Sequence, residues 1–119
     1  MSSPIEVVDA FDQAYARRDV DALMALTTPE VEVLDVSGAR LMDRAQMHEL
    51  YASLFRDSPD LEERILQRLV VGDVVVQDEE IHGMQVSGFP TDLRAVVAAQ
   101  VHDGKVARLV FLSIVDLNT

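Results

Sequence analysis

Apolar residues recur at helical spacing near the start of the chain. Ser3-Pro4-Ile5-Glu6 combines a capping serine, a proline suited to the first helical position and a glutamate that can return the capping hydrogen bond. The apolar positions that follow repeat every three or four residues, as Ile5, Val8, Phe11 and Tyr15. The spacing predicts a helix that ends near Arg18, then a shorter helix that Asp19 caps and that stops before Pro29.

A second helical stripe lies in the middle of the chain. Asp43-Arg44-Ala45-Gln46 has the form of a capping box, and apolar residues follow at the spacing of a buried helix face: Met47, Leu50, Tyr51, Leu54 and Phe55. We therefore expect a helix that begins after Asp43 and stops before Ser58-Pro59.

Alternating apolar residues dominate elsewhere and predict strands. One strand over 31–36 precedes the middle helix, and four longer ones follow it over 61–71, 74–83, 93–102 and 106–115. Gly72-Asp73 and Asp103-Gly104 separate the members of two hairpins, and Asp-Gly supplies the positive φ angles of a two-residue turn. Helices first and antiparallel hairpins last predict an α+β fold.

The last two strands are apolar on both faces. Odd-numbered residues from Leu93 to Val101 form a wholly apolar face, whereas the face with Gln100 and His102 is mixed. We expect helices to cover the first face, and a second copy of the chain to cover the other as a homodimer through the sheet. If the register slips by one residue, Gln100 and His102 turn inward instead.

Size and charge narrow the classes of function. With 119 residues and 49% apolar content, we expect a single domain over 1–119. The net charge of -11 disfavours nucleic acid and anionic membranes as partners. The absence of cysteine excludes thiolate chemistry and sulfur-ligated metals. The sequence shows neither a leader pattern nor an apolar run of membrane length, so we expect a cytoplasmic protein.

The order of these segments resembles the nuclear-transport-factor-two-like superfamily, in its SnoaL-like and ketosteroid-isomerase-like branch. The stretches that carry the likeness are 7–23, 31–35, 47–55 and both hairpins, which together cover nearly the whole chain. The likeness implies a cone-shaped, strongly curved, mostly antiparallel sheet packed against N-terminal helices, the cystatin-like α+β roll, around an apolar cavity. It implies no particular reaction, because its motifs are diffuse.

Asp35 is the candidate catalytic residue. It continues the strand face begun by Val31 and Val33, where an ionised carboxylate needs a partner or a raised pKa. By the resemblance, it falls where ketosteroid isomerases keep their proton-shuttling aspartate. The alternative is that Asp35 ends its strand and caps the Ser37-Gly38 turn through its side chain.

An isomerase also needs hydrogen-bond donors for a developing oxyanion. The resemblance puts the key tyrosine of ketosteroid isomerases at Phe11, and the region 98–100, where a second acid is expected, holds no carboxylate. We therefore do not expect a true ketosteroid isomerase. Tyr15, one helical turn beyond Phe11, and Tyr51 are either substitute donors or core residues with hydrated hydroxyls.

The remaining polar residues give less specific signals. His48, His82 and His102 lack the spacing of a metal site, so we expect surface positions for all three, with no metal and no cofactor. Glu79, within Asp78-Glu79-Glu80, matches a carboxylate of steroid-isomerase-like relatives. It lines the cavity mouth or belongs to a solvated strand edge, and the pattern favours the edge.

Three functions stay open. The first is a cofactor-independent isomerase or cyclase-like lyase in which Asp35 moves a proton on a small, apolar, carbonyl-bearing molecule. The second is a module that binds such a molecule without turnover, and the third is a structural homodimer whose own side chains fill the cavity. The side chains expected to line the cavity are Phe11, Tyr15, Val33, Tyr51, Phe55, Val97, Ala99 and Phe111.

Overall fold

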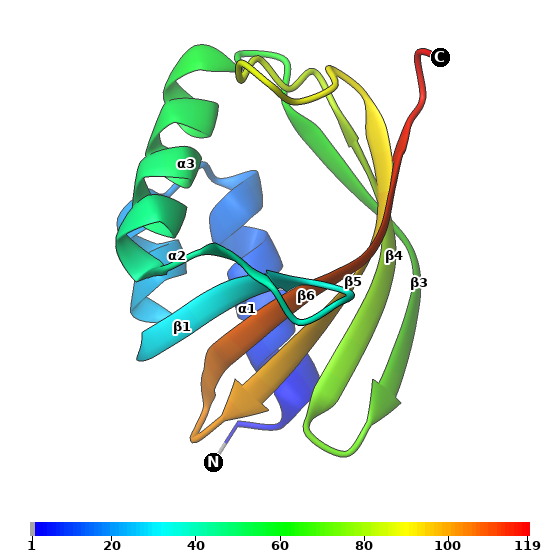
Figure 1. Ribbon diagram of the computed structural model, residues 1–119. Helices are drawn as coiled ribbons and strands as arrows, with labels where there is room; N and C mark the ends of the chain where they lie inside the picture. The colour runs from blue at the N-terminus through cyan, green and yellow to red at the C-terminus, as the bar shows by residue number, and fades with distance from the viewer. Residues whose placement is uncertain (1) are drawn as a thin grey trace.

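The computed structural model describes residues 2–119, which form three helices and one sheet (Figure 1). The helices are α1 (Pro4–Ala16), α2 (Val20–Ala25) and α3 (Arg44–Asp57). The strands are β1 (Thr27–Asp35), β2 (Arg40–Met42), β3 (Glu62–Val71), β4 (Val74–His82), β5 (Leu93–His102) and β6 (Lys105–Asp116). Every expected helix and strand is present, and the short β2 was not predicted.

The sheet curves around the helices. Its strand order is β2-β1-β6-β5-β4-β3, and all neighbouring pairs are antiparallel except β1 with β6, which are parallel. Figure 1 shows the helices on the concave side of the sheet. The predicted α+β class, with a curved and mostly antiparallel sheet against N-terminal helices, is confirmed, and the parallel pair is an addition to it.

Local capping explains where the helices begin. Ser3 and Glu6 form a capping box at α1, and Asp43 and Gln46 form another at α3. Asp19 caps α2 by accepting a hydrogen bond from a backbone N–H in its first turn. Each cap satisfies N–H groups that have no partner within the helix, an effect typically of ~1 kcal/mol. No helix within 2–119 is long and apolar enough to span a membrane.

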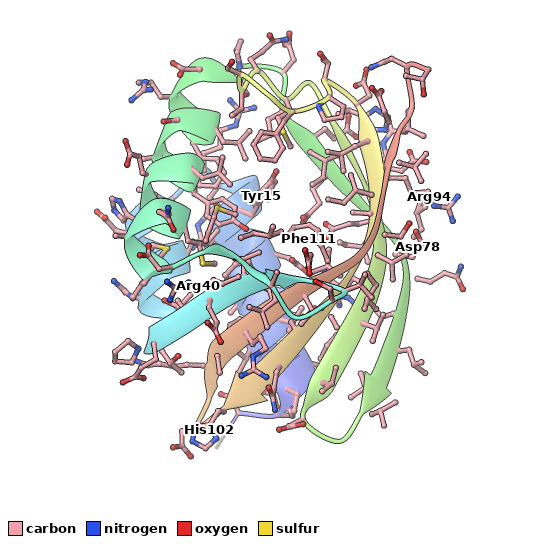
Figure 2. All side chains as sticks on the ribbon, viewed as in Figure 1. Tyr15, Arg40, Asp78, Arg94, His102 and Phe111 are labelled. Carbon is pink, nitrogen blue, oxygen red and sulfur yellow. The ribbon has the colours of Figure 1, made fainter. Side chains whose placement is uncertain are left out.

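The register of β5 decides which of its residues face the helices. Its odd-numbered residues from Leu93 to Val101 are buried, whereas Gln100 lies on the opposite side and His102 is exposed. Of the two registers left open above, the one with the odd-numbered residues inward is therefore confirmed. On the convex side, Arg94 binds Asp78 through two hydrogen bonds of 2.9 and 2.7 Å, and Figure 2 shows both side chains projecting away from the helices.

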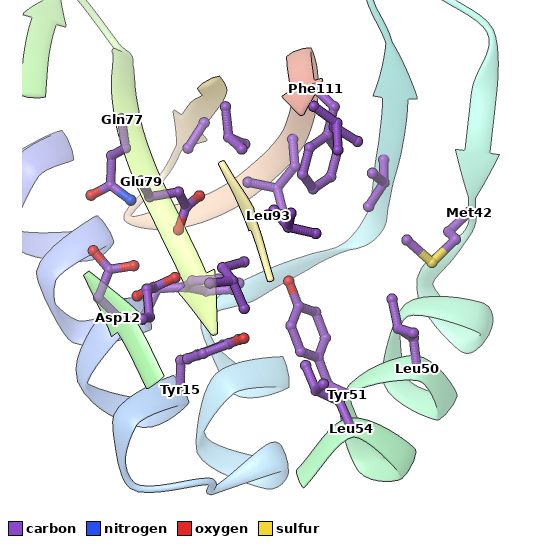
Figure 3. A pocket seen from close by; sticks show the side chains of 18 of the residues that line it. Asp12, Tyr15, Met42, Leu50, Tyr51, Leu54, Gln77, Glu79, Leu93 and Phe111 are labelled. Atoms are coloured by element: carbon purple, nitrogen blue, oxygen red, sulfur yellow. The ribbon is translucent and has the colours of Figure 1, made fainter. Parts of the chain in front are cut away.

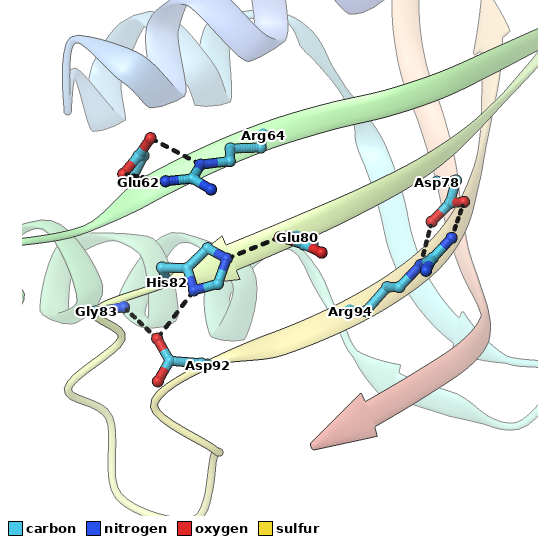
Figure 4. A network of polar contacts seen from close by, with 8 residues as sticks. All are labelled: Glu62, Arg64, Asp78, Glu80, His82, Gly83, Asp92 and Arg94. Carbon is cyan, nitrogen blue, oxygen red and sulfur yellow. Dashed lines mark hydrogen bonds and ion pairs between the residues drawn. The ribbon is translucent and has the colours of Figure 1, made fainter. Parts of the chain in front are cut away.

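A polar network closes the base of the loop between β4 and β5, residues 83–92. His82 Nε2 lies 2.9 Å from Glu80 Oε1, and His82 Nδ1 lies 3.1 Å from Asp92 Oδ1 (Figure 4). The same Asp92 oxygen accepts a hydrogen bond from the Gly83 N–H at 3.2 Å. The hydrogen bond to Glu80, followed by that to Asp92, raises the pKa of His82. The side chain of Asp92 thus holds the two ends of the loop together through His82 and the N–H of Gly83.

Candidate functional site

A cavity of about 440 Å³ lies between the helices and the concave face of the sheet (Figure 3). Apolar side chains from α1, α3 and the concave face of the sheet make up most of its wall, together with Met84 and Phe89 of the 83–92 loop. The wall includes all the side chains expected to line a cavity except Phe55: Phe11, Tyr15, Val33, Tyr51, Val97, Ala99 and Phe111. Phe55 instead packs against Tyr15, with ring centroids 5.3 Å apart.

Asp35 is held by a turn and does not line the cavity. Its Oδ1 accepts hydrogen bonds from the N–H and O–H of Ser37, at 2.8 and 2.5 Å, and from the N–H of Ala39 at 3.1 Å. These bonds, the Ser37 hydroxyl first, lower the pKa of Asp35 below its usual value. Of the two possibilities, hydrogen-bond partners or a raised pKa, the structure shows the partners, and the turn-capping alternative describes the observed geometry.

Three other carboxyl side chains line the cavity at one end, which we call the acidic end: Asp12 of α1, Glu63 of β3 and Glu79 of β4. Figure 3 shows Asp12 and Glu79 on the same side of the cavity, near Gln77 and Tyr15. Glu79 is only 6% exposed, and its Oε2 atom has no hydrogen-bond partner. The expectation of a solvated strand edge is therefore wrong for Glu79.

Burial changes the ionisation of the acidic end. It raises the pKa of Glu63 to about 10, and a hydrogen bond with Glu79 contributes to this rise. Burial also raises the pKa of Glu79, while the hydrogen bond from Glu63 acts in the opposite direction. Glu63 therefore keeps its proton at neutral pH and donates it to Glu79 in this hydrogen bond. Burial raises the pKa of Asp12 to about 7, against the effect of Arg68.

Two tyrosines stand beside these carboxyls. Tyr15 is 5% exposed and its hydroxyl has no hydrogen-bond partner, so the expectation of a hydrated hydroxyl is wrong for it. Burial raises the pKa of both Tyr15 and Tyr51, which keeps both phenols neutral. Their rings meet edge to face with centroids 6.0 Å apart, and Phe11 packs similarly against Tyr51 at 6.3 Å. Tyr15 thus offers a free donor in the cavity wall.

Behind the acidic end, a second hollow of about 410 Å³ lies between α1 and β3 and shares Asp12, Tyr15 and Glu63 with the cavity. Arg68 lines this hollow. Its guanidinium donates to Asp12 Oδ2 at 2.7 Å, to Gln77 Oε1 at 2.8 Å and to Asp9. The shared carboxyls therefore form a partition between two separate spaces.

The sequence contained part of the signal for this site. In β4, residues 75, 77, 79 and 81 share one face under strand alternation, and Val75 is an apolar core residue. The acidic run Asp78-Glu79-Glu80 favoured a solvated position for Glu79, although strand alternation places Glu79 on the same face as Val75. Asp12 and Glu63 were not singled out, because no local pattern shows that α1 packs against β3 and β4.

The histidines do not join the site. His48 and His102 are exposed, as expected, whereas His82 is partly buried in the network of Figure 4. Within residues 2–119, no three histidine or carboxylate side chains are arranged to hold a metal ion.

A curved, mostly antiparallel sheet packed against N-terminal helices is the architecture of the nuclear-transport-factor-two-like class of fold. The chain matches the SnoaL-like domain family over residues 7–109 and belongs to that family. No curated protein matches the chain significantly.

Solved structures share the fold. An uncharacterised cystatin-fold protein from Novosphingobium aromaticivorans is 21% identical, with a TM-score of 0.83 over 95% of this chain and 100% of that one. A putative polyketide cyclase from Sinorhizobium meliloti is 22% identical, with a TM-score of 0.71 over 89% and 93%. A hypothetical protein with a ketosteroid-isomerase-like fold from Catenulispora acidiphila, in complex with trimethylamine, is 18% identical, with a TM-score of 0.70 over 94% of this chain and 87% of that one.

Proposed function

We propose that the cavity binds a small, largely apolar, carbonyl-bearing molecule and that the Glu63–Glu79 pair exchanges a proton with it. The observation that carries the proposal is Glu79, a buried carboxyl in the cavity wall with one oxygen unpartnered. Leaving such a group unsatisfied costs ~1–3 kcal/mol, and a polar group of a ligand would remove that cost. Membership of the SnoaL-like family and the likeness to a putative polyketide cyclase support a small ligand and cyclase-like or isomerase-like chemistry.

The acidic end and the neighbouring Tyr15 together supply a base and a hydrogen-bond donor for a proton transfer. The Glu79 carboxylate can take a proton from a carbon next to the carbonyl, which breaks a C–H bond and leaves an enolate. The Tyr15 hydroxyl is a neutral donor for the enolate oxygen. The protonated carboxyl then returns the proton to the same or another carbon of the ligand. The enzyme ends in its starting state.

Two alternatives remain within this proposal. Asp35 is the rival base because of its place in the family resemblance, although its carboxylate is engaged by Ser37. The other alternative is a cavity that binds its ligand without turnover, which the same unpartnered oxygen of Glu79 would also serve.

The test uses 2-tetralone, an apolar bicyclic ketone with acidic protons beside its carbonyl. We expect the protein to bind it and to accelerate exchange of those protons in deuterated water, followed by proton NMR. Glu79→Gln, which keeps the shape of the side chain, should lower the exchange rate at least about tenfold. Glu49→Gln, on the exposed side of α3, is the matched control and should leave it unchanged.

Each other outcome has a defined meaning. Loss of exchange in Asp35→Asn but not in Glu79→Gln would transfer the base to Asp35. Binding without exchange in the unaltered protein would support the non-catalytic module. Absence of binding to 2-tetralone and to related ketones would contradict the proposed ligand class.

A further inference from the structure

The charges around the cavity all have one sign. Asp12, Glu63 and Glu79 line it, and no lysine, arginine or histidine among residues 2–119 does so. Arg68 is the cation that contacts the acidic end, and its guanidinium already binds Asp9, Asp12 and Gln77 from the other hollow. An ionised carboxylate of the Glu63–Glu79 pair therefore meets no counterion on the cavity side.

The unpartnered oxygen shows where a positive group would fit. Glu79 is only 6% exposed, and its Oε2 atom has no hydrogen-bond partner. The rings of Phe11, Tyr15 and Tyr51 line the same cavity and are packed edge to face. Aromatic faces attract cations, and the attraction grows where water is excluded. A carboxylate and aromatic rings in one cavity therefore favour a substituted ammonium group over a neutral group of the same shape.

We propose that the ligand of this cavity carries a cationic amine, which lies against Glu79 Oε2 among the aromatic rings while the apolar remainder of the ligand fills the rest of the cavity. This inference rests on the proposed function and deepens it by naming the polar group of the ligand. It also excludes anionic ligands such as carboxylates and phosphates, since they would meet three acids and no free base.

Protonation of the acidic end must then oppose binding. The titratable groups that face the site are Asp12 and Tyr15 from α1, Tyr51 from α3, Glu63 from β3 and Glu79 from β4, with Arg68 behind them. A cation stabilises the ionised carboxyls, so its binding releases protons. Its affinity should therefore rise with pH through the range near 7, where Asp12 titrates.

The experiment compares two probes of equal shape. Benzyltrimethylammonium and neopentylbenzene differ in one atom, nitrogen against carbon, and therefore in charge. The ammonium has no titratable proton, so any pH dependence of its binding belongs to the protein. We expect it to bind at least about tenfold more tightly than the hydrocarbon near neutral pH, a difference of ~1.4 kcal/mol, measured by titration with the same cosolvent for both.

Variants locate the effect. Glu79→Gln should weaken binding of the ammonium about tenfold and leave binding of the hydrocarbon within about twofold, and Glu49→Gln should change neither. Equal or weaker binding of the ammonium, or an affinity that falls as pH rises, would overturn the inference and leave the proposed carbonyl-bearing ligand standing. Failure of both probes and of 2-tetralone to bind would instead contradict the proposed function itself.

Discussion

Carboxyl groups on different strands of this fold ionise differently because their oxygens meet different partners. Asp35 accepts three hydrogen bonds in an exposed turn, and its pKa falls. Glu79 and Glu63 meet each other and little water, and the pKa of each rises. The pKa of a carboxyl group here therefore depends more on the number of hydrogen-bond donors around it and on its loss of water than on whether it is Asp or Glu.

Glu63 gives a prediction about stability. In the unfolded chain it loses its proton near its ordinary pKa, whereas in the folded protein it keeps the proton up to about pH 10. Folding between these values takes up a proton, so its contribution to the free energy of unfolding is complete below the unfolded pKa and is lost as pH rises. Glutamine does not titrate, so Glu63→Gln removes this loss of stability at high pH. We expect the variant to be more stable than the unaltered protein by about 1–3 kcal/mol near pH 8.

Urea unfolding at acidic and alkaline pH checks this. Near about pH 4 the glutamine and the protonated glutamate are alike, and the two proteins should differ little. A variant that is destabilised equally at both pH values would show that Glu63 is ionised in the folded state.

At the scale of the elements, specific polar contacts hold the 83–92 loop of the cavity wall in place. Gln85 donates its N–H to the Oγ of the fully buried Ser58 at 2.9 Å, which joins the loop to the end of α3. Gly83 has a φ of +76°, and a Cβ atom there would overlap the carbonyl group of Asp60. The loop therefore approaches the α3–β3 connection closely enough to require glycine.

Two glycine substitutions separate backbone strain from steric overlap. Gly83→Ala and Gly88→Ala both place a side chain at positive φ, but the Cβ at Gly88 would meet nothing within 4 Å. We expect Gly83→Ala to lower the free energy of unfolding by about 2 kcal/mol more than Gly88→Ala, measured by urea unfolding. Similar losses in both variants would show that the loop moves aside without cost.

Elements that depend on neighbours in sequence were predicted well. Ser3 and Asp43 cap their helices through residues three positions away, and the turn at Asp103-Gly104 adopts positive φ at both positions. The parallel pairing of β1 with β6 was missed because it depends on packing between distant segments. The short β2 was missed for a related reason, since it forms only by pairing with β1.

The candidate site divides in the same way. Side chains on regular apolar stripes, such as Phe11, Tyr15 and Val97, were correctly expected to line a cavity. The acidic end was not assembled from the sequence, because Asp12, Glu63 and Glu79 come from three elements whose packing no spacing reveals. Charged residues are mostly exposed in proteins, so a sequence analysis expects them at the surface. The burial of three acids together departs from this rule and is visible only in the tertiary structure.

At the scale of the whole molecule, the convex face of the sheet carries a continuous apolar row. Leu69, Val76, Ala98 and Val110 are direct register partners across β3, β4, β5 and β6, so they lie side by side on this face. Leu69 is 61% exposed. We propose that a second copy of the chain covers this row, as the apolar pattern of the last two strands indicates.

The proposed homodimer has a direct test. We expect the protein to sediment as a dimer at micromolar concentration, and Ala98→Glu to give a monomer, because it places a charge at the centre of the apolar row. Val36→Glu is the control, since Val36 is 70% exposed in the turn after β1. Its sedimentation should match that of the unaltered protein. A monomer before any substitution would contradict the proposal.

The parallel pair of β1 and β6 has a consequence for how the chain is made. Figure 1 shows these strands side by side in the sheet. The pairing joins residues that are far apart in the sequence, such as Val33 of β1 and Leu109 of β6. During synthesis, β1 leaves the ribosome long before its partner exists, and the sheet stays in two pieces until β6 emerges. Such distant pairing makes folding slow and leaves apolar edges exposed meanwhile. The join that completes the cavity wall is thus the last part of the molecule that translation allows to form.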